Sequence, residues 1–196
     1  NIIIEKKSKS NNNSLVIILK IEDVYYNQEL TLNLIKSIYN KHENISFIIT
    51  YSDNQSFFYK GMVNGSQAYL SSINKNENFN VLLIELDKNK NEIISGGFGR
   101  TSPLWMVKNL NSAYLDENIK NNIGKFHLSL ISKSQFYKIT PLATYLLNEI
   151  PSICANFDIN STSNQQIINV ISNFVDSYFN ESDTLHIKND VHYLYF

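Results

Sequence analysis

The chain has 196 residues, a formal net charge of −1 and 43% hydrophobic residues. This length and apolar content suffice for one domain with its own core. A near-neutral chain has no long-range attraction to nucleic acid, so no nucleic-acid partner is expected. The sequence contains no apolar run of roughly 18 residues that would predict a transmembrane segment.

The polar stretch "EKKSKSNNNS" predicts a disordered leader or linker over residues 1–14. A single globular domain should then occupy residues 15–196, with 125–196 as an alternative C-terminal helical and hairpin extension. Because the sequence begins with Asn1, we expect a fragment of a larger protein, or a domain cut after an anchor. The compartment stays open between the cytoplasm, which the basic flank favours, and export.

The first half of the domain predicts a βαβ unit. The apolar run Leu15–Ile21 indicates a strand that is covered on both faces. Leu30, Leu34 and Ile38 then form one apolar stripe of a helix for which Asn27 is the expected N-cap. A second β-branched run follows at Ile45–Ser52, and this spacing predicts two parallel strands joined by the helix.

The middle of the chain is less regular. Two glycines argue against a helix around residues 57–63, where we expect a strand, then a turn at Asn64-Gly65 and a short helix to Ile73. The apolar runs on either side of Asp87–Asn91 predict a β-hairpin of antiparallel neighbours. Pro103 opens the next helix, which continues towards Gly124.

In the last part we expect a strand at Phe126–Ser132, a helix at "TPLATYLLNEI", a longer helix at "STSNQQIINVISNFVDSYF" and a terminal hairpin. The predicted fold class is therefore α/β: a central mixed sheet with a βαβ unit and an antiparallel hairpin, and helices on both faces. The element order over residues 15–123 resembles a thioredoxin-like arrangement. Without a Cys-x-x-Cys motif the redox activity of that fold is not implied, and longin-like and profilin-like domains share parts of the order, so no family is assigned.

The stretch "IISGGFGRTSPLW" contains three of the six glycines, the sole arginine and the sole tryptophan. A glycine-rich turn before a helix N-terminus can present backbone N–H groups to an anion, and a guanidinium can grip a phosphate or carboxylate. The candidate ligand-binding residues are Gly96, Gly97, Gly99, Arg100, Thr101 and Ser102.

Two other interpretations of this turn stay open. The glycines could form a bulge or a close backbone crossing with no ligand. Alternatively, Phe98, Arg100 and Trp105 could form a protein-contact site, since these residue types often dominate interfaces. The glycine spacing matches neither the dinucleotide fingerprint nor the P-loop, so no cofactor is predicted.

Other chemistry-bearing residues are scattered. Glu22 and Asp23 follow the first strand at its carboxyl end, where open α/β sheets place their ligands, and could act as a base, bind a cation or begin a solvated loop. The single cysteine, Cys154, lies in an apolar stretch and is expected to be a buried, inert thiol. A zinc site is conceivable but not predicted at the terminal residues Asp183, His186, Asp190 and His192.

No nucleophile motif, metal cluster or cofactor fingerprint stands out, and the chain carries twelve Tyr and eleven Phe. Aromatic side chains suit protein contacts because they give a large contact area with few rotamers to freeze. The sequence therefore favours a non-catalytic protein-interaction or assembly domain with another protein as its partner. The alternative is an anion-recognising domain that binds a phosphate- or carboxylate-bearing small molecule at the Gly96–Ser102 turn, with enzymatic activity as an open question.

Overall fold

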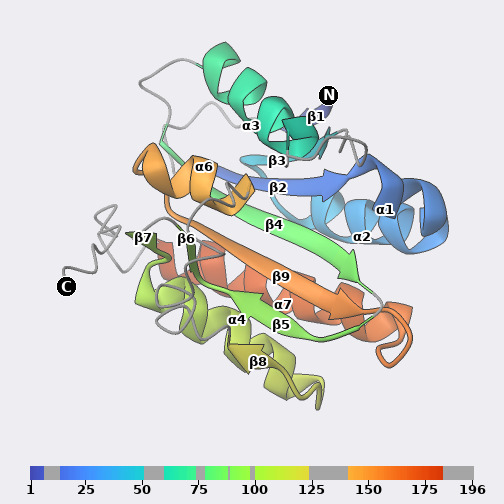
Figure 1. Cartoon of the computed structure of the whole chain (residues 1–196). Helices are drawn as coiled ribbons and strands as arrows, with labels where there is room; N and C mark the ends of the chain where they lie inside the picture. The colour runs from blue at the N-terminus through green and yellow to red at the C-terminus, as the bar shows by residue number, and fades with distance from the viewer. Residues whose placement is uncertain are drawn as a thin grey trace.

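The computed structural model describes residues 1–6, 14–50, 60–73, 78–87, 89–97, 100–123 and 141–182. A seven-stranded sheet runs in the order β1-β3-β2-β4-β9-β5-β8 (Figure 1). Its strands are β1 (Ile2–Lys6), β3 (Ile45–Thr50), β2 (Ser14–Lys20), β4 (Phe79–Asp87), β9 (Ser152–Asp158), β5 (Glu92–Ile94) and β8 (Asn122–Ile123). A separate two-stranded pair joins β6 (Gly96–Gly97) to β7 (Arg100–Thr101).

The centre of the sheet is parallel. β2 pairs in parallel with β3 on one side and β4 on the other, and β4 pairs in parallel with β9. The edges are antiparallel, because β1 runs against β3 and β5 runs against β9. Strands of the parallel centre are rich in Ile, Leu and Val because both faces of such a sheet are covered.

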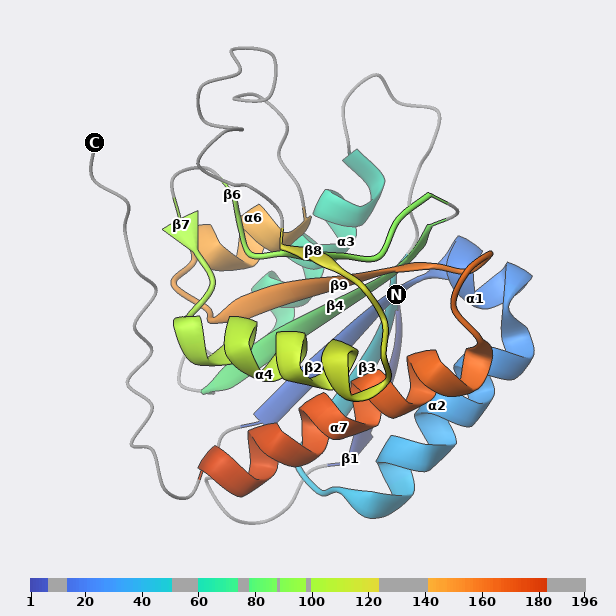
Figure 2. The same cartoon turned by 90° about the horizontal axis from the view of Figure 1, so that it is seen from below.

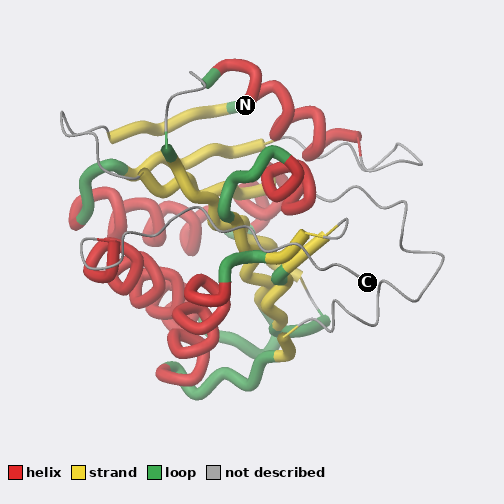
Figure 3. Tube along the Cα trace, turned by 90° about the vertical axis from the view of Figure 1, so that its left-hand side faces the viewer, coloured by secondary structure: helices red, strands yellow, loops and turns green. Residues whose placement is uncertain are grey.

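Helices cover both faces of the sheet (Figures 2 and 3). One face packs against α2 (Gln28–Lys41), α4 (Leu104–Asp116) and α7 (Asn164–Ser182), in a core that includes Phe47, Leu82 and Phe174. The other face packs against α3 (Lys60–Ser72) and α6 (Pro141–Leu147), around Leu83 and Tyr145. The short helix α1 (Ile21–Tyr26) follows β2 directly.

The chain reverses its direction across the sheet between β2 and β4. From β2 it passes through α1 and α2 to β3 on one side, and from β3 it passes through α3 on the opposite face to β4 on the other side of β2. In open α/β sheets, the carboxyl ends of strands at such a switch point form the usual ligand site. The topology therefore predicts a ligand site at the carboxyl ends of β2 and β4.

The predicted α/β class is confirmed: the sheet is mixed, β2 and β3 form a βαβ unit, and helices lie on both faces. The helices predicted at "TPLATYLLNEI" and "STSNQQIINVISNFVDSYF" correspond to α6 and α7. Burial of Cys154 is confirmed as well, and burial raises the pKa of its thiol. Among the described residues, no helix is long and apolar enough to cross a membrane.

Two local predictions differ from the structure. Residues 2–6, which we placed in a disordered leader, form β1, because the Ile-rich segment pairs with β3. Residues from Lys60 onward are helical where we expected a strand and a turn. A Cβ at Gly65 would lie 3.3 Å from the Cβ of Thr50, so glycine at this helix position allows α3 to approach β3 closely.

The predicted hairpin of neighbouring strands at Asp87–Asn91 is also wrong, because β9 lies between β4 and β5. β9 pairs with β4 from Val81 to Asp87, a longer ladder than the three-residue β5 could provide. The predicted strand at Phe126–Ser132 and the terminal hairpin lie outside the described residues.

Candidate active site

A row of polar side chains crosses the sheet near the carboxyl ends of its parallel strands. Lys20 is the register partner of Thr50, and Asn156 is the partner of both Glu85 and Glu92. Lys20 and Glu85 are joined by an ion pair. We call these five residues the polar row: Thr50, Lys20, Glu85, Asn156 and Glu92.

Strand alternation places the polar row on the α3/α6 face of the sheet. Two residues earlier on the four parallel strands, and two residues later on the antiparallel β5, the side chains form an apolar row in or against the core of that face: Ile48, Ile18, Leu83, Cys154 and Ile94. Since residues i and i+2 of a strand point to the same side, the polar row extends the same face towards the carboxyl edge. On this face of five neighbouring strands, the side chains change from apolar to polar between one row and the next.

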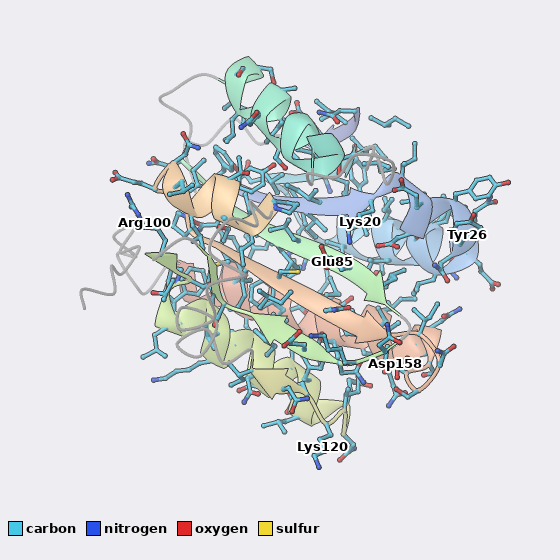
Figure 4. All side chains as sticks on the ribbon, viewed as in Figure 1. Lys20, Tyr26, Glu85, Arg100, Lys120 and Asp158 are labelled. Atoms are coloured by element: carbon cyan, nitrogen blue, oxygen red, sulfur yellow. The ribbon has the colours of Figure 1, made fainter. Side chains whose placement is uncertain are left out.

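The ion pair at the centre of the row lies at the switch point. Lys20 Nζ is 3.0 Å from Glu85 Oε1, and the two side chains are 28% and 23% exposed (Figure 4). Burial lowers the pKa of Lys20, but the carboxylates of Glu85 and Asp23 more than offset it, so its pKa is raised. Lys20 is therefore a fixed positive charge at the ends of β2 and β4.

Asp23 stands beside this pair, in the first turn of α1. Its Oδ2 accepts a hydrogen bond from the Leu86 backbone N–H at 3.0 Å, which ties α1 to β4. Burial raises the pKa of the Asp23 carboxyl to about 6, against the lowering effects of the Leu86 N–H and Lys20. A carboxyl group with this pKa can both accept and release a proton near neutral pH.

Two polar atoms at this end of the sheet lack a partner among the described residues. The Oδ1 atom of Asn156 is buried without a hydrogen bond, and the whole residue is 3% exposed. The Oε2 atom of Glu22, next to Asp23, is also buried and unbonded. Buried polar groups are bonded in the large majority of cases, so these two unsatisfied atoms beside a charged cluster require an explanation.

The described residues contain no group of three or more His, Cys, Asp or Glu side chains that could hold a metal ion. The arrangement instead supplies a proton-transfer group in Asp23, a fixed cation in Lys20 and hydrogen-bond acceptors in Glu85, Asn156 and Glu92. Of these, the sequence pointed only to Asp23, together with Glu22, by their place after a strand. The others could be recognised only once the strand order was known.

The Gly96–Ser102 turn lies at the opposite end of the sheet from Lys20 and Glu85 (Figure 4). Gly96 pairs with Thr101 and Gly97 with Arg100 in the short β6–β7 ladder. The Arg100 side chain is 18% exposed, with its Nη1 3.7 Å from Glu149 Oε1. Phe98 and Gly99 lie outside the described residues.

Ser102 and Trp105 are set into the base of this turn. Ser102 is buried, and its backbone N–H donates to the Ser95 carbonyl at 2.8 Å. Trp105 is half-buried, with its ring centroid 5.9 Å from that of Tyr178, so most of this ring packs inward. The anion-binding and protein-contact roles of the turn stay predictions.

The histidines and aspartates considered for zinc at 183–192 lie outside the described residues.

Comparison with protein families gives a clear match. The model of the TP_0564_1st family, described as a first domain, matches residues 2–196. The chain belongs to the TP_0564_1st family. No curated protein matches it.

Three solved structures have a similar arrangement of elements. A futalosine hydrolase mutant of Helicobacter pylori strain 26695 has a TM-score of 0.49 at 12% identity, over 88% of this chain and 100% of that one. A bacteriophage poly-gamma-glutamate hydrolase has a TM-score of 0.44 at 9% identity, over 91% and 89%. The 5'-methylthioadenosine/S-adenosyl homocysteine nucleosidase of Campylobacter jejuni has a TM-score of 0.44 at 8% identity, over 86% and 96%.

The prediction of a non-catalytic protein-interaction or assembly domain is wrong by this comparison, because the similar structures are named as hydrolases and a nucleosidase. The sequence contained no catalytic motif that argued otherwise. These identities and TM-scores assign none of the named activities to this chain.

Proposed function

We propose that the chain is an enzyme that performs acid–base chemistry on a small polar molecule bound over the polar row. The observation that carries the proposal is the half-buried Lys20–Glu85 pair beside Asp23 at the switch point of the sheet. Such a pair at the surface would be of little consequence. Here its position coincides with the place where open α/β sheets bind their ligands.

In this proposal each residue has a separate role. Asp23 accepts a proton from the substrate or from a water molecule, and the Leu86 N–H holds its carboxylate in place. Lys20 stabilises the negative charge that develops on the substrate as the proton leaves. Glu85 fixes the Lys20 ammonium at 3.0 Å, so that this charge needs no rearrangement during the reaction.

The proposal is tested by thermal unfolding against a panel of small polar metabolites. A ligand present at 100 times its Kd adds about 2.7 kcal/mol of stability and moves the Tm by several degrees. We expect compounds that shift the wild-type Tm to lose the shift in Lys20→Met and to keep it in Lys120→Met, an exposed lysine far from Lys20 and Glu85 (Figure 4). Hits that act equally on both variants would argue against a site at the polar row.

The Gly96–Ser102 turn is a second candidate, as an anion site. The observation that favours it is the Ser102 Oγ atom, which is buried without a hydrogen bond among the described residues, just before α4 begins. A helix N-terminus attracts anions. If Arg100 clamps the anion, Arg100→Lys should weaken the binding of inorganic phosphate about tenfold, because the charge stays and the planar fork is lost. Equal phosphate affinity of wild type and Arg100→Lys in calorimetric titration would remove this site.

A further inference from the structure

Asn156 is the residue of the polar row that lies between two glutamates. On one side its register partner is Glu85 of β4, and on the other it is Glu92 of β5. Side chains directly opposite each other on neighbouring strands are about 5 Å apart at their Cβ atoms. The carboxamide of Asn156 is therefore flanked by two carboxylates on the same face of the sheet.

The burial of Asn156 has no structural explanation in its own contacts. Its backbone carbonyl accepts a hydrogen bond from the Tyr114 hydroxyl at 2.9 Å, but its Oδ1 atom is buried and receives none from the described residues. Asn80 in β4 is equally buried and its Oδ1 is also unbonded among the described residues, but its Nδ2 donates to the Tyr178 hydroxyl at 2.9 Å, whereas no side-chain hydrogen bond of Asn156 is seen. A buried carbonyl without a donor costs stability, and an apolar residue would avoid that cost.

The side chains around Asn156 determine which ligand group can hydrogen-bond to its unbonded Oδ1 atom. Glu85 and Glu92 are acceptors, and each is paired with a lysine, Lys20 and Lys90 respectively. A phosphate or carboxylate next to Asn156 would offer no hydrogen-bond donor to its Oδ1 atom or to the two flanking carboxylates. A group that carries several N–H donors and a positive charge fits three acceptors in a row.

We infer that Asn156, held between Glu85 and Glu92, binds a protonated amine or guanidinium group of the substrate. This inference rests on the proposed function, because it assigns the substrate class of the same site. The nitrogen cation lies over β9, beside the charges of Lys20 and Asp23 over β2 and β4. Asn156 and Glu92 would thus bind the substrate, while Lys20 and Asp23 would act on its reacting atoms.

The test compares Asn156→Leu with the matched variant Asn80→Leu. Without ligand, Asn156→Leu should raise the Tm by about 2–4 °C, because an unbonded buried carbonyl is replaced by an apolar group of similar size. Asn80→Leu should lower it, because the loss of the Nδ2 hydrogen bond to the Tyr178 hydroxyl outweighs the removal of the unbonded Asn80 Oδ1. A fall of the Tm in Asn156→Leu comparable with that of Asn80→Leu would show that Asn156 is structural and would overturn the inference.

The ligand arm uses agmatine and 1,4-diaminobutane as probes, with butan-1-ol as the neutral control and inorganic phosphate as the anionic one. Both amines should bind wild type and Asn80→Leu, and bind Asn156→Leu at least about tenfold more weakly. If Asn156→Leu does not fold, Asn156→Ala replaces it. Absence of amine binding to wild type, or equal amine affinity in the Asn156 variant, contradicts the inference. If no amine binds but uncharged or anionic compounds bind to wild type and not to Lys20→Met, the proposed function is supported and only the cation-binding role of Asn156 is wrong.

Discussion

Replacement of Asp23 by asparagine should stabilise the protein at pH 8 by about 2–3 kcal/mol and leave its stability at pH 4 nearly unchanged. The reason is the burial of this carboxyl group, which raises its pKa from 3.8 to about 6 in the folded chain. Asparagine keeps the shape and an oxygen acceptor for the Leu86 N–H, but it carries no charge to desolvate.

The sign of the pH dependence follows from proton counting. Between pH 4 and pH 6 the folded state holds a proton on Asp23 that the unfolded state has already released, so wild-type stability falls as the pH rises through this window. Above pH 6 both states are ionised and the full penalty remains. Below pH 4 both are protonated and the penalty vanishes, so wild type and Asp23→Asn converge.

Urea unfolding of both proteins at pH 4 and pH 8 measures this difference. Asp116→Asn, at an exposed position at the end of α4, is the control and should change the free energy of unfolding by less than about 0.5 kcal/mol at either pH. Loss of stability in Asp23→Asn at pH 8 would mean that the carboxylate is a needed structural partner of Leu86. The gain expected here is typical of a residue retained for function at a cost in stability.

The second large effect is expected for Lys20→Met, which should cost about 2 kcal/mol at pH 8. Methionine retains the apolar stem, but the half-buried Glu85 and Asp23 carboxylates lose the cation between them. Partial exposure of the pair keeps the cost below that of a fully buried ion pair.

A double-mutant cycle separates this pair from its surroundings. Lys20→Met and Glu85→Gln together should cost about 1–2 kcal/mol less than the sum of the single changes, because the second change removes the unpaired charge left by the first. Lys90→Met, in the more exposed pair with Glu92, serves as the matched control and should cost less than about 1 kcal/mol. Strict additivity of the first two changes would show that the 3.0 Å contact contributes nothing.

The local parts of the fold were predictable from the sequence, and the long-range parts were not. The run Leu15–Ile21 and the stripe of Leu30, Leu34 and Ile38 identified β2 and α2, because burial pattern and period agree within each segment. β9 was missed because "SICANFD" interrupts its apolar residues with polar ones. Its parallel partner β4 lies far away in the sequence, so no turn signalled the pairing.

The same limit explains the candidate site. Asp23 could be anticipated because its position after a strand is a local property. Lys20, Glu85 and Asn156 look like ordinary strand-end residues until the register places them side by side. The sole arginine, in contrast, stood out by composition alone, and rarity in a sequence carries no information about position in the fold.

The most direct test is an NMR titration that follows the side-chain carboxyl carbon of Asp23 in wild type and in Lys20→Met. The account predicts a pKa of about 6 for Asp23 in wild type. It also predicts a higher value in Lys20→Met, because the nearby ammonium lowers this pKa. A wild-type pKa near 4 that does not respond to the loss of Lys20 would contradict a proton-transfer site at the carboxyl ends of β2 and β4.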